Sequence, residues 1–233
     1  DETSRGLGDV YKRQVLAMLI AFLQSVVPLV GTRRNSYGMM SFGSVAANLQ
    51  FALLLVAFAS LTHAFVTSDF SVRLVALNSH SLKPLLYKIS GVWGNHEGSM
   101  LLWVLILALF GASAVWFGSN LPIRLKATVL SVQGAVGLAF LIFIVFTSNP
   151  FLRIFPIPFD GQDLNPLLQD PGLAFHPPFL YVGYVGLSMS FSFAVAALIE
   201  GRIDAAWGRW VRPWTLAAWL FLTIGIAPVS YTH

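Results

Sequence analysis

The sequence predicts an all-α fold, a polytopic bundle of transmembrane helices. Three observations favour this class. Hydrophobic residues make up 56% of the 233 residues, and the mean hydropathy is +0.72. Charged residues make up 10% of the chain, against about 25% in a typical soluble domain. Several long stretches carry almost no charge and reach the length of about 20 apolar residues that a spanning helix needs.

Five stretches meet this length, and a sixth starts near the end of the chain. The five cover residues 15–31, 44–66, 99–118, 127–147 and 177–199. The sixth begins near Pro213 with WTLAAWLFLTIGIA and is interrupted by PVSYTH. We therefore predict five complete transmembrane helices plus a truncated sixth.

Both ends of the chain differ from the sequence between them. Residues 1–14 are polar and carry no small-residue cleavage site of a signal peptide, and residues 228–233 break an apolar run. Both strings resemble translated adapter sequence. We predict that 1–14 and 228–233 are non-native tails, and that 15–227 is the N-terminal part of a longer membrane domain.

The connections between the predicted helices alternate in character. The short ones are basic and contain Arg33, Arg34, Arg124, Lys126, Arg202, Arg209 and Arg212. The two long loops, 67–98 and 148–176, contain only Arg73, Lys83, Lys88 and Arg153. The positive-inside rule places the short loops in the cytoplasm and the long loops outside, in the periplasm of a bacterial cell. Long loops tend to carry function, so we expect the functional site on the outer face.

The composition also excludes several classes of function. The absence of Cys excludes disulfides, iron–sulfur clusters and thiolate zinc sites within this chain. The sequence pI of about 9.6 reflects basic loops of a membrane topology, so we predict no nucleic-acid partner. An alternative class is a non-catalytic transporter or an assembly subunit that recruits partners through its outer loops. The near absence of ionisable residues inside the predicted helices argues against the transporter.

The first outer loop ends in Trp93-Gly94-Asn95-His96-Glu97-Gly98-Ser99. Trp93 suits a membrane-interface anchor, and Ser99 is a candidate helix cap. His96 and Glu97 are either helix-end residues or members of a polar site. Adjacent His and Glu lack the spacing of a metal site on one helix face.

The second outer loop ends in Phe175-His176-Pro177-Pro178. A residue before proline is disfavoured in a helix, so we predict that His176 is extended and that Pro177 starts the fifth helix. A histidine fixed at such a place is either structural or an axial ligand for haem iron. We expect His63 at a helix end to be structural, and His80 in NSHS to be solvated.

Four strings carry a resemblance to a known family. They are WGNHEGSMLLW, FTSNPF, DLNPLLQDPGLAFHPPFLYVGYVG and RPWTLAAWLFLTIGI. In order and spacing they closely resemble the CcmF family, the haem lyase component of bacterial System I cytochrome c biogenesis. The resemblance covers nearly all of the chain between its two ends.

The resemblance implies a polytopic protein of the bacterial inner membrane, with its functional loops on the periplasmic side. It implies that the intact protein accepts haem from the chaperone CcmE and promotes its covalent attachment to apocytochrome c. CcmH-type and CcmI-type partners and the lipid bilayer complete its surroundings. The implied cofactor is a transiently bound b-type haem, with His176 as an axial ligand to its iron. The second ligand and a structural haem site are expected outside this sequence, so we do not expect the fragment to act alone.

Haem needs an apolar slot with few polar groups. We expect Trp93, Phe155, Phe159 and Phe175 to line that slot. His96 and Glu97 are further candidates for the same outer cavity.

Overall fold

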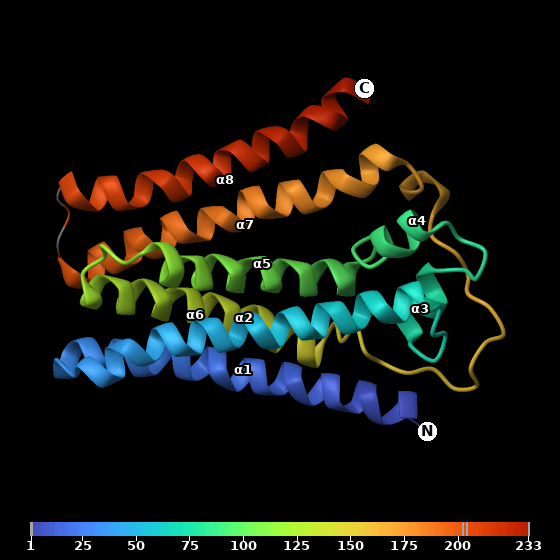
Figure 1. Ribbon diagram of the computed structural model, residues 1–233, viewed down its shortest axis with the longest axis horizontal. Coiled ribbons are helices and arrows are strands. Elements are labelled where there is room, and N and C mark those ends of the chain that lie inside the picture. The colour runs from blue at the N-terminus through green and yellow to red at the C-terminus, as the bar shows by residue number, and fades with distance from the viewer. Residues whose placement is uncertain (1, 202, 204, 233) are drawn as a thin grey trace.

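The computed structural model describes residues 2–201, 203 and 205–232 (Figure 1). Six long helices form a bundle: α1 (Glu2–Arg34), α2 (Tyr37–Val66), α5 (His96–Phe117), α6 (Ile123–Phe146), α7 (Pro171–Glu200) and α8 (Ala205–Thr232). The short helices α3 (Arg73–Asn78) and α4 (Leu85–Ser90) and the 3-10 turn η1 (Pro166–Leu168) lie in the two long connections. The predicted all-α fold class is confirmed.

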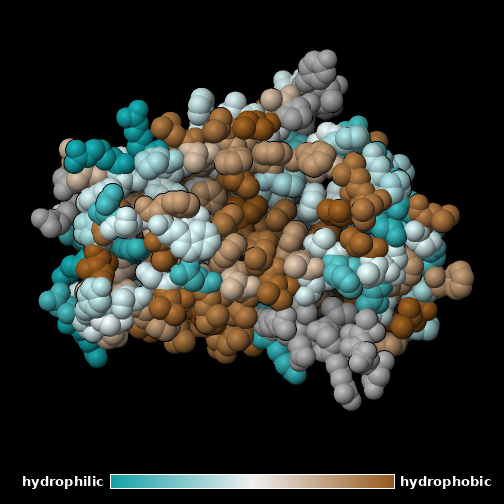
Figure 2. Space-filling model, viewed as in Figure 1, coloured by the Kyte–Doolittle hydropathy of each residue, from teal (hydrophilic) through white to brown (hydrophobic). Residues whose placement is uncertain are grey.

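Successive long helices run in opposite directions, so the connections gather at two ends of the bundle. The loop end, on the right of Figure 1, holds α3, α4 and the segment 147–170. The basic end is opposite and holds Arg33, Arg34, Arg124, Arg209 and Arg212. Between these ends, hydrophobic residues cross the middle of the visible face (Figure 2). The two long loops therefore share one end, as the sequence predicts.

All six long helices contain a stretch that is long and apolar enough to cross a membrane. The prediction that the sixth is cut short is wrong. Its candidate span, Ala205–Ala227, has 23 residues. The helix starts before Pro213 because Arg209 and Arg212 lie in its first turns, where the sequence analysis assigned a loop.

The fifth helix also starts earlier than predicted. The Asp170 side chain accepts a hydrogen bond of 3.1 Å from the Leu173 backbone N–H, and Pro171 occupies the first helical turn. This is a standard helix start, with an Asp cap followed by proline. The predicted start at Pro177 is wrong, and His176 is helical rather than extended.

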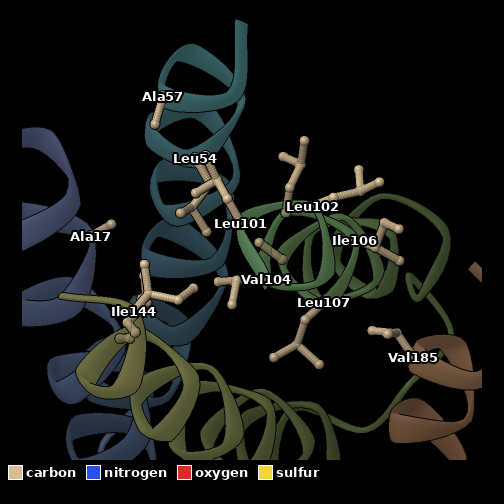
Figure 3. Packing of buried hydrophobic residues seen from close by; sticks show 14 of the residues in the cluster. Ala17, Leu54, Ala57, Leu101, Leu102, Val104, Ile106, Leu107, Ile144 and Val185 are labelled. Atoms are coloured by element: carbon tan, nitrogen blue, oxygen red, sulfur yellow. The ribbon is translucent and has the colours of Figure 1, made fainter. Parts of the chain in front are cut away.

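The core of the bundle is built around α5, whose span is the most buried of the six. Side chains from α1, α2, α6 and α7 point toward α5, as Figure 3 shows for Ala17, Leu54, Val104, Ile144 and Val185. All five are buried. A few polar side chains join helices within this core. Gln133 Nε2 on α6 donates to Ser188 Oγ on α7 at 3.1 Å, which satisfies polar groups away from water.

Helices α7 and α8 pack at very short range because glycines lie at their contact points. A Cβ on Gly183 would lie 2.6 Å from the Leu222 backbone nitrogen, and one on Gly225 would lie 2.8 Å from the Leu180 nitrogen. Only glycine permits this approach. It brings the backbone of α8 within hydrogen-bonding distance of side chains on α7.

The predicted tails concern the origin of the two ends, which stays a prediction. The backbone of α1 continues through residues 2–14, and that of α8 reaches Thr232. Gln14 is fully buried. The side chains of Tyr11 and Tyr231, which would test the packing of the tails, lie outside the described residues, as do Asp1 and His233.

Candidate functional site

A cavity of about 500 Å³ opens at the loop end, between the first turns of α5 and α7. Its wall is mainly apolar and aromatic, with a few polar groups. The lining residues are Ser90, Trp93, Gly94, Asn95, His96, Ser99, Met100, Trp103, Leu164, Leu168, Leu173, Ala174, Pro177 and Tyr181. This composition is typical of sites for flat apolar ligands with polar substituents.

Trp93 joins the first outer loop to the first turns of α7. Its indole Nε1 donates to the Ala174 carbonyl oxygen at 2.9 Å. That carbonyl is available because Pro178, four residues later, has no N–H to donate to it. The proline in the helix and the tryptophan in the loop thus complement each other, and Trp93 fixes the segment of α7 that carries His176.

We predict that Trp93→Phe destabilises the protein by about 1–3 kcal/mol, because it leaves the buried Ala174 carbonyl without a donor. Thermal unfolding in detergent measures the change. Trp219→Phe is the matched control, because Trp219 is an exposed residue of α8. An equal loss in both variants would contradict the role of the Trp93 bond.

The loop between Trp93 and α5 is closed by its own polar side chains. Asn95 caps α5, with its side-chain oxygen accepting from the Gly98 N–H at 2.7 Å. Ser99 is not the cap that the sequence suggested. Its Oγ donates to the Trp93 carbonyl at 2.7 Å and lies 3.2 Å from the Tyr181 hydroxyl on α7. The hydroxyl of Ser99 therefore ties the loop to both helices that form the cavity.

His96 and Glu97 occupy the first turn of α5 but have different surroundings. His96 is exposed at the cavity wall, and its ring centroid lies 6.0 Å from that of Phe143, edge to face. Glu97 is half-buried and does not line the cavity. The structure thus brings Trp93 and His96 together at one cavity and leaves Glu97 outside it.

His176 lies on another side of α7, against α8. Its Nδ1 is 2.5 Å from the Gly225 carbonyl oxygen, and it does not line the cavity, although the next residue, Pro177, does. A carbonyl partner selects the tautomer in which Nδ1 carries the proton, and Nε2 then keeps its lone pair. Metal-binding histidines are commonly held in this way. The expectation that His176 shares a cleft with Trp93 or His96 is wrong.

The aromatic residues predicted to line the slot behave differently from Trp93. The exposed fractions of Phe155, Phe159 and Phe175 are 73%, 102% and 55%, and none of them lines the cavity. The proline-rich segment carries Phe155 and Phe159 on its outside, while Phe175 lies on the outer face of α7.

The aromatic residues that do meet below the cavity were missed. Trp103 on α5 makes edge-to-face contacts with Phe140, Tyr181 and Tyr184, with centroid distances of 6.0, 5.5 and 4.9 Å. The only hint in the sequence is the spacing of three between Tyr181 and Tyr184, which places them on one helix face. Nothing in the sequence indicates that this face meets Trp103.

The other histidines do not add a metal site. His63 is exposed on α2. His80 is not simply solvated, as predicted, since its Nε2 lies 3.4 Å from Asp160 Oδ2. Among the described residues, no group of three or more His, Cys, Asp or Glu side chains is placed to bind a metal ion.

A polar clamp holds the two long loops together beside the cavity. Lys83, only 7% exposed, donates to the Asn78 carbonyl at 2.9 Å and pairs with Asp163 at 2.9 Å. Asp160 accepts from both the hydroxyl and the backbone N–H of Ser81. The clamp positions Leu164, which lines the cavity.

The clamp predicts a pH dependence. The hydrogen bond from the Ser81 hydroxyl lowers the pKa of Asp160 from 3.8 to about 2. A depressed carboxyl pKa stabilises the folded loops above the ordinary value, and this contribution is lost as the pH falls toward 2. Proteolysis of segment 147–170 in detergent should therefore rise between pH about 4 and 2. Asp160→Asn should be cleaved readily at all pH values, and a wild-type loop that opens equally at neutral pH would contradict the assignment.

Comparison with known proteins places this arrangement in a family. The sequence profile of the family described as "Cytochrome C assembly protein" matches residues 93–228, which include the cavity, His176 and the first turns of α8. The match covers more than half of the chain.

Curated relatives share high identity. The chain is 70% identical over 217 residues to "Cytochrome c-type biogenesis protein ccl1" of Rhodobacter capsulatus, covering 93% of this chain and 33% of that protein. It is 50% identical over 212 residues to "Cytochrome c-type biogenesis protein CcmF" of Escherichia coli, covering 91% and 33%. The chain thus spans about a third of the length of these relatives.

A solved structure shows the same fold. "Cytochrome c Heme Lyase CcmF" superposes with a TM-score of 0.78 at 27% sequence identity, covering 91% of this chain and 33% of that one. On the profile, the relatives and the fold together, the chain belongs to the cytochrome c assembly protein family.

Proposed function

We propose that the intact protein acts in cytochrome c maturation as a multi-pass protein of the bacterial inner membrane. In this proposal it accepts a transiently bound b-type haem from a periplasmic chaperone of the CcmE type and promotes covalent attachment to apocytochrome c. CcmH-type and CcmI-type proteins present the apocytochrome. The names of the relatives and of the solved haem lyase support this function.

The observation that carries the proposal is the setting of His176. Its Nδ1 faces the Gly225 carbonyl, so Nε2 is suited to act as an axial ligand to haem iron. Haem supplies the reactive vinyl groups, while the chain supplies binding and orientation. Trp93 serves as a positioning residue through Ala174, and His96 contributes a polar group at the neighbouring cavity. Glu97 has no such support.

The experiment that tests the function uses a bacterial strain that lacks its own haem lyase. Expression of the intact protein should restore covalent haem on c-type cytochromes, detected by haem-dependent peroxidase staining after denaturing electrophoresis. Membrane levels of the chaperone and of apocytochrome c serve as controls. Failure to restore haem attachment while all components are present would favour the non-catalytic assembly or transport alternative.

The proposed orientation gives a separate prediction. If the loop end is periplasmic, single cysteines at Asn78 and Gln162 should react with an impermeant thiol reagent in whole cells. A cysteine at Gly208, on the basic end, should react only after lysis. The chain contains no Cys, so the background is clean. Labelling of Gly208→Cys in whole cells would reverse the topology.

A further inference from the structure

A second cavity lies at the basic end, far from the haem-handling region. It has a volume of about 390 Å³ and lies between the loop after α5 and the first turns of α8. Its lining residues are Phe117, Gly118, Asn120, Leu121, Arg209, Trp210, Pro213, Trp214 and Ala217. No acidic residue is among them.

The wall of this cavity changes from polar to apolar along α8. Arg209 and Asn120 are exposed at the end of the bundle, Trp210 and Trp214 are half-buried, and Ala217 lies further along the helix. Arg209 and Ala217 are separated by eight residues, or about 12 Å along the helix axis. Because α8 runs from the basic end into the candidate membrane span, this direction leads from the water boundary into the bilayer.

A second cation lies behind the same wall. Lys126 Nζ on α6 is 3.3 Å from the Val115 carbonyl and 3.4 Å from the Gly118 carbonyl, and Gly118 lines the cavity. The ammonium group counters the negative end of the α5 helix dipole, which would otherwise repel an anion. The rim therefore presents the positive charge of Arg209 without an opposing carboxylate.

We propose that this cavity binds an anionic phospholipid. Its phosphate pairs with Arg209, whose guanidinium matches phosphate geometry, and the two indoles lie at the level of the headgroup and glycerol. One acyl chain then follows Trp214 and Ala217 into the membrane. Basic pockets between transmembrane helices commonly bind anionic headgroups, and the charge and the apolar floor here fit that ligand.

The test compares the purified protein in nanodiscs of phosphatidylcholine alone and of phosphatidylcholine with phosphatidylglycerol. Native mass spectrometry measures how tightly each lipid is retained. Arg209→Gln should weaken phosphatidylglycerol retention by about fivefold, the effect of about 1 kcal/mol for one basic residue near an anionic headgroup. Arg34→Gln is the matched control, because Arg34 is exposed at the same end but does not line the cavity. It should leave retention unchanged.

Two further arms separate a lipid site from a simple phosphate site. Ala217→Phe should lower retention by filling the path of the acyl chain, while keeping the positive charge. Glycerol phosphate, which lacks acyl chains, should not displace the lipid. The proposal is overturned if Arg34→Gln weakens retention as much as Arg209→Gln, if phosphatidylcholine binds equally well, or if glycerol phosphate competes.

Discussion

Replacing His176 by alanine in the intact protein is expected to lower covalent haem on c-type cytochromes by about tenfold or more. Loss of groups that merely orient a metal ligand typically costs 10–100-fold, so loss of the ligand itself should cost at least as much. The amount of protein in the membrane should stay unchanged. Peroxidase staining of cytochrome c and immunoblotting of membranes measure the two quantities.

A matched variant separates ligation from packing, because His176 also bonds to the Gly225 carbonyl. In His176→Asn the side-chain amide nitrogen replaces Nδ1 and can donate to that carbonyl, but no atom replaces Nε2. This variant should fold like the wild type and mature as little cytochrome c as His176→Ala.

Further variants complete the test of His176. Added imidazole should partly restore His176→Gly, while His63→Ala and His80→Ala should mature cytochrome c normally. Normal maturation by His176→Ala or His176→Asn would show that His176 is not a ligand, and the assembly-subunit alternative would then gain support.

Gly98→Ala is expected to be the most damaging single change to the loop end. A Cβ at this position would lie 1.7 Å from the Val92 carbonyl oxygen, a backbone atom that cannot move without reshaping the turn before α5. The same turn holds the Asn95 cap and precedes the indole that fixes α7. We expect the free energy of unfolding to fall by about 3 kcal/mol or more, which is in the range of severe overpacking.

The matched control is Gly38→Ala in the first turn of α2, where an added Cβ meets no atom within 4 Å. Alanine has the higher helix propensity, so this change should be neutral or stabilise the protein by up to about 1 kcal/mol. Thermal unfolding in detergent, followed by tryptophan fluorescence, measures both variants. Equal stability of Gly98→Ala and Gly38→Ala would mean that the turn relaxes easily.

The sequence by itself determined the fold class and the sidedness of the loops. Burial of apolar side chains in a bilayer demands long uncharged stretches, and this requirement is visible in the order of residues alone. All six spans were found in this way, and both long loops lie at one end. Local rules were less reliable at helix ends. The rule for a residue before proline predicted an extended His176, but the Asp170 cap starts the helix earlier.

Only the tertiary structure decided which side chains meet. Sequence reasoning named Trp93, His96 and His176, yet it could not show that Trp93 and His96 share a cavity while His176 faces α8. It also missed Trp103, whose aromatic partners come from two other helices. Hydropathy reports only that a residue prefers to leave water. The partner that it finds there depends on how helices far apart in the chain are rotated and how closely they pack, which here is set by contacts such as Gly183 against Leu222.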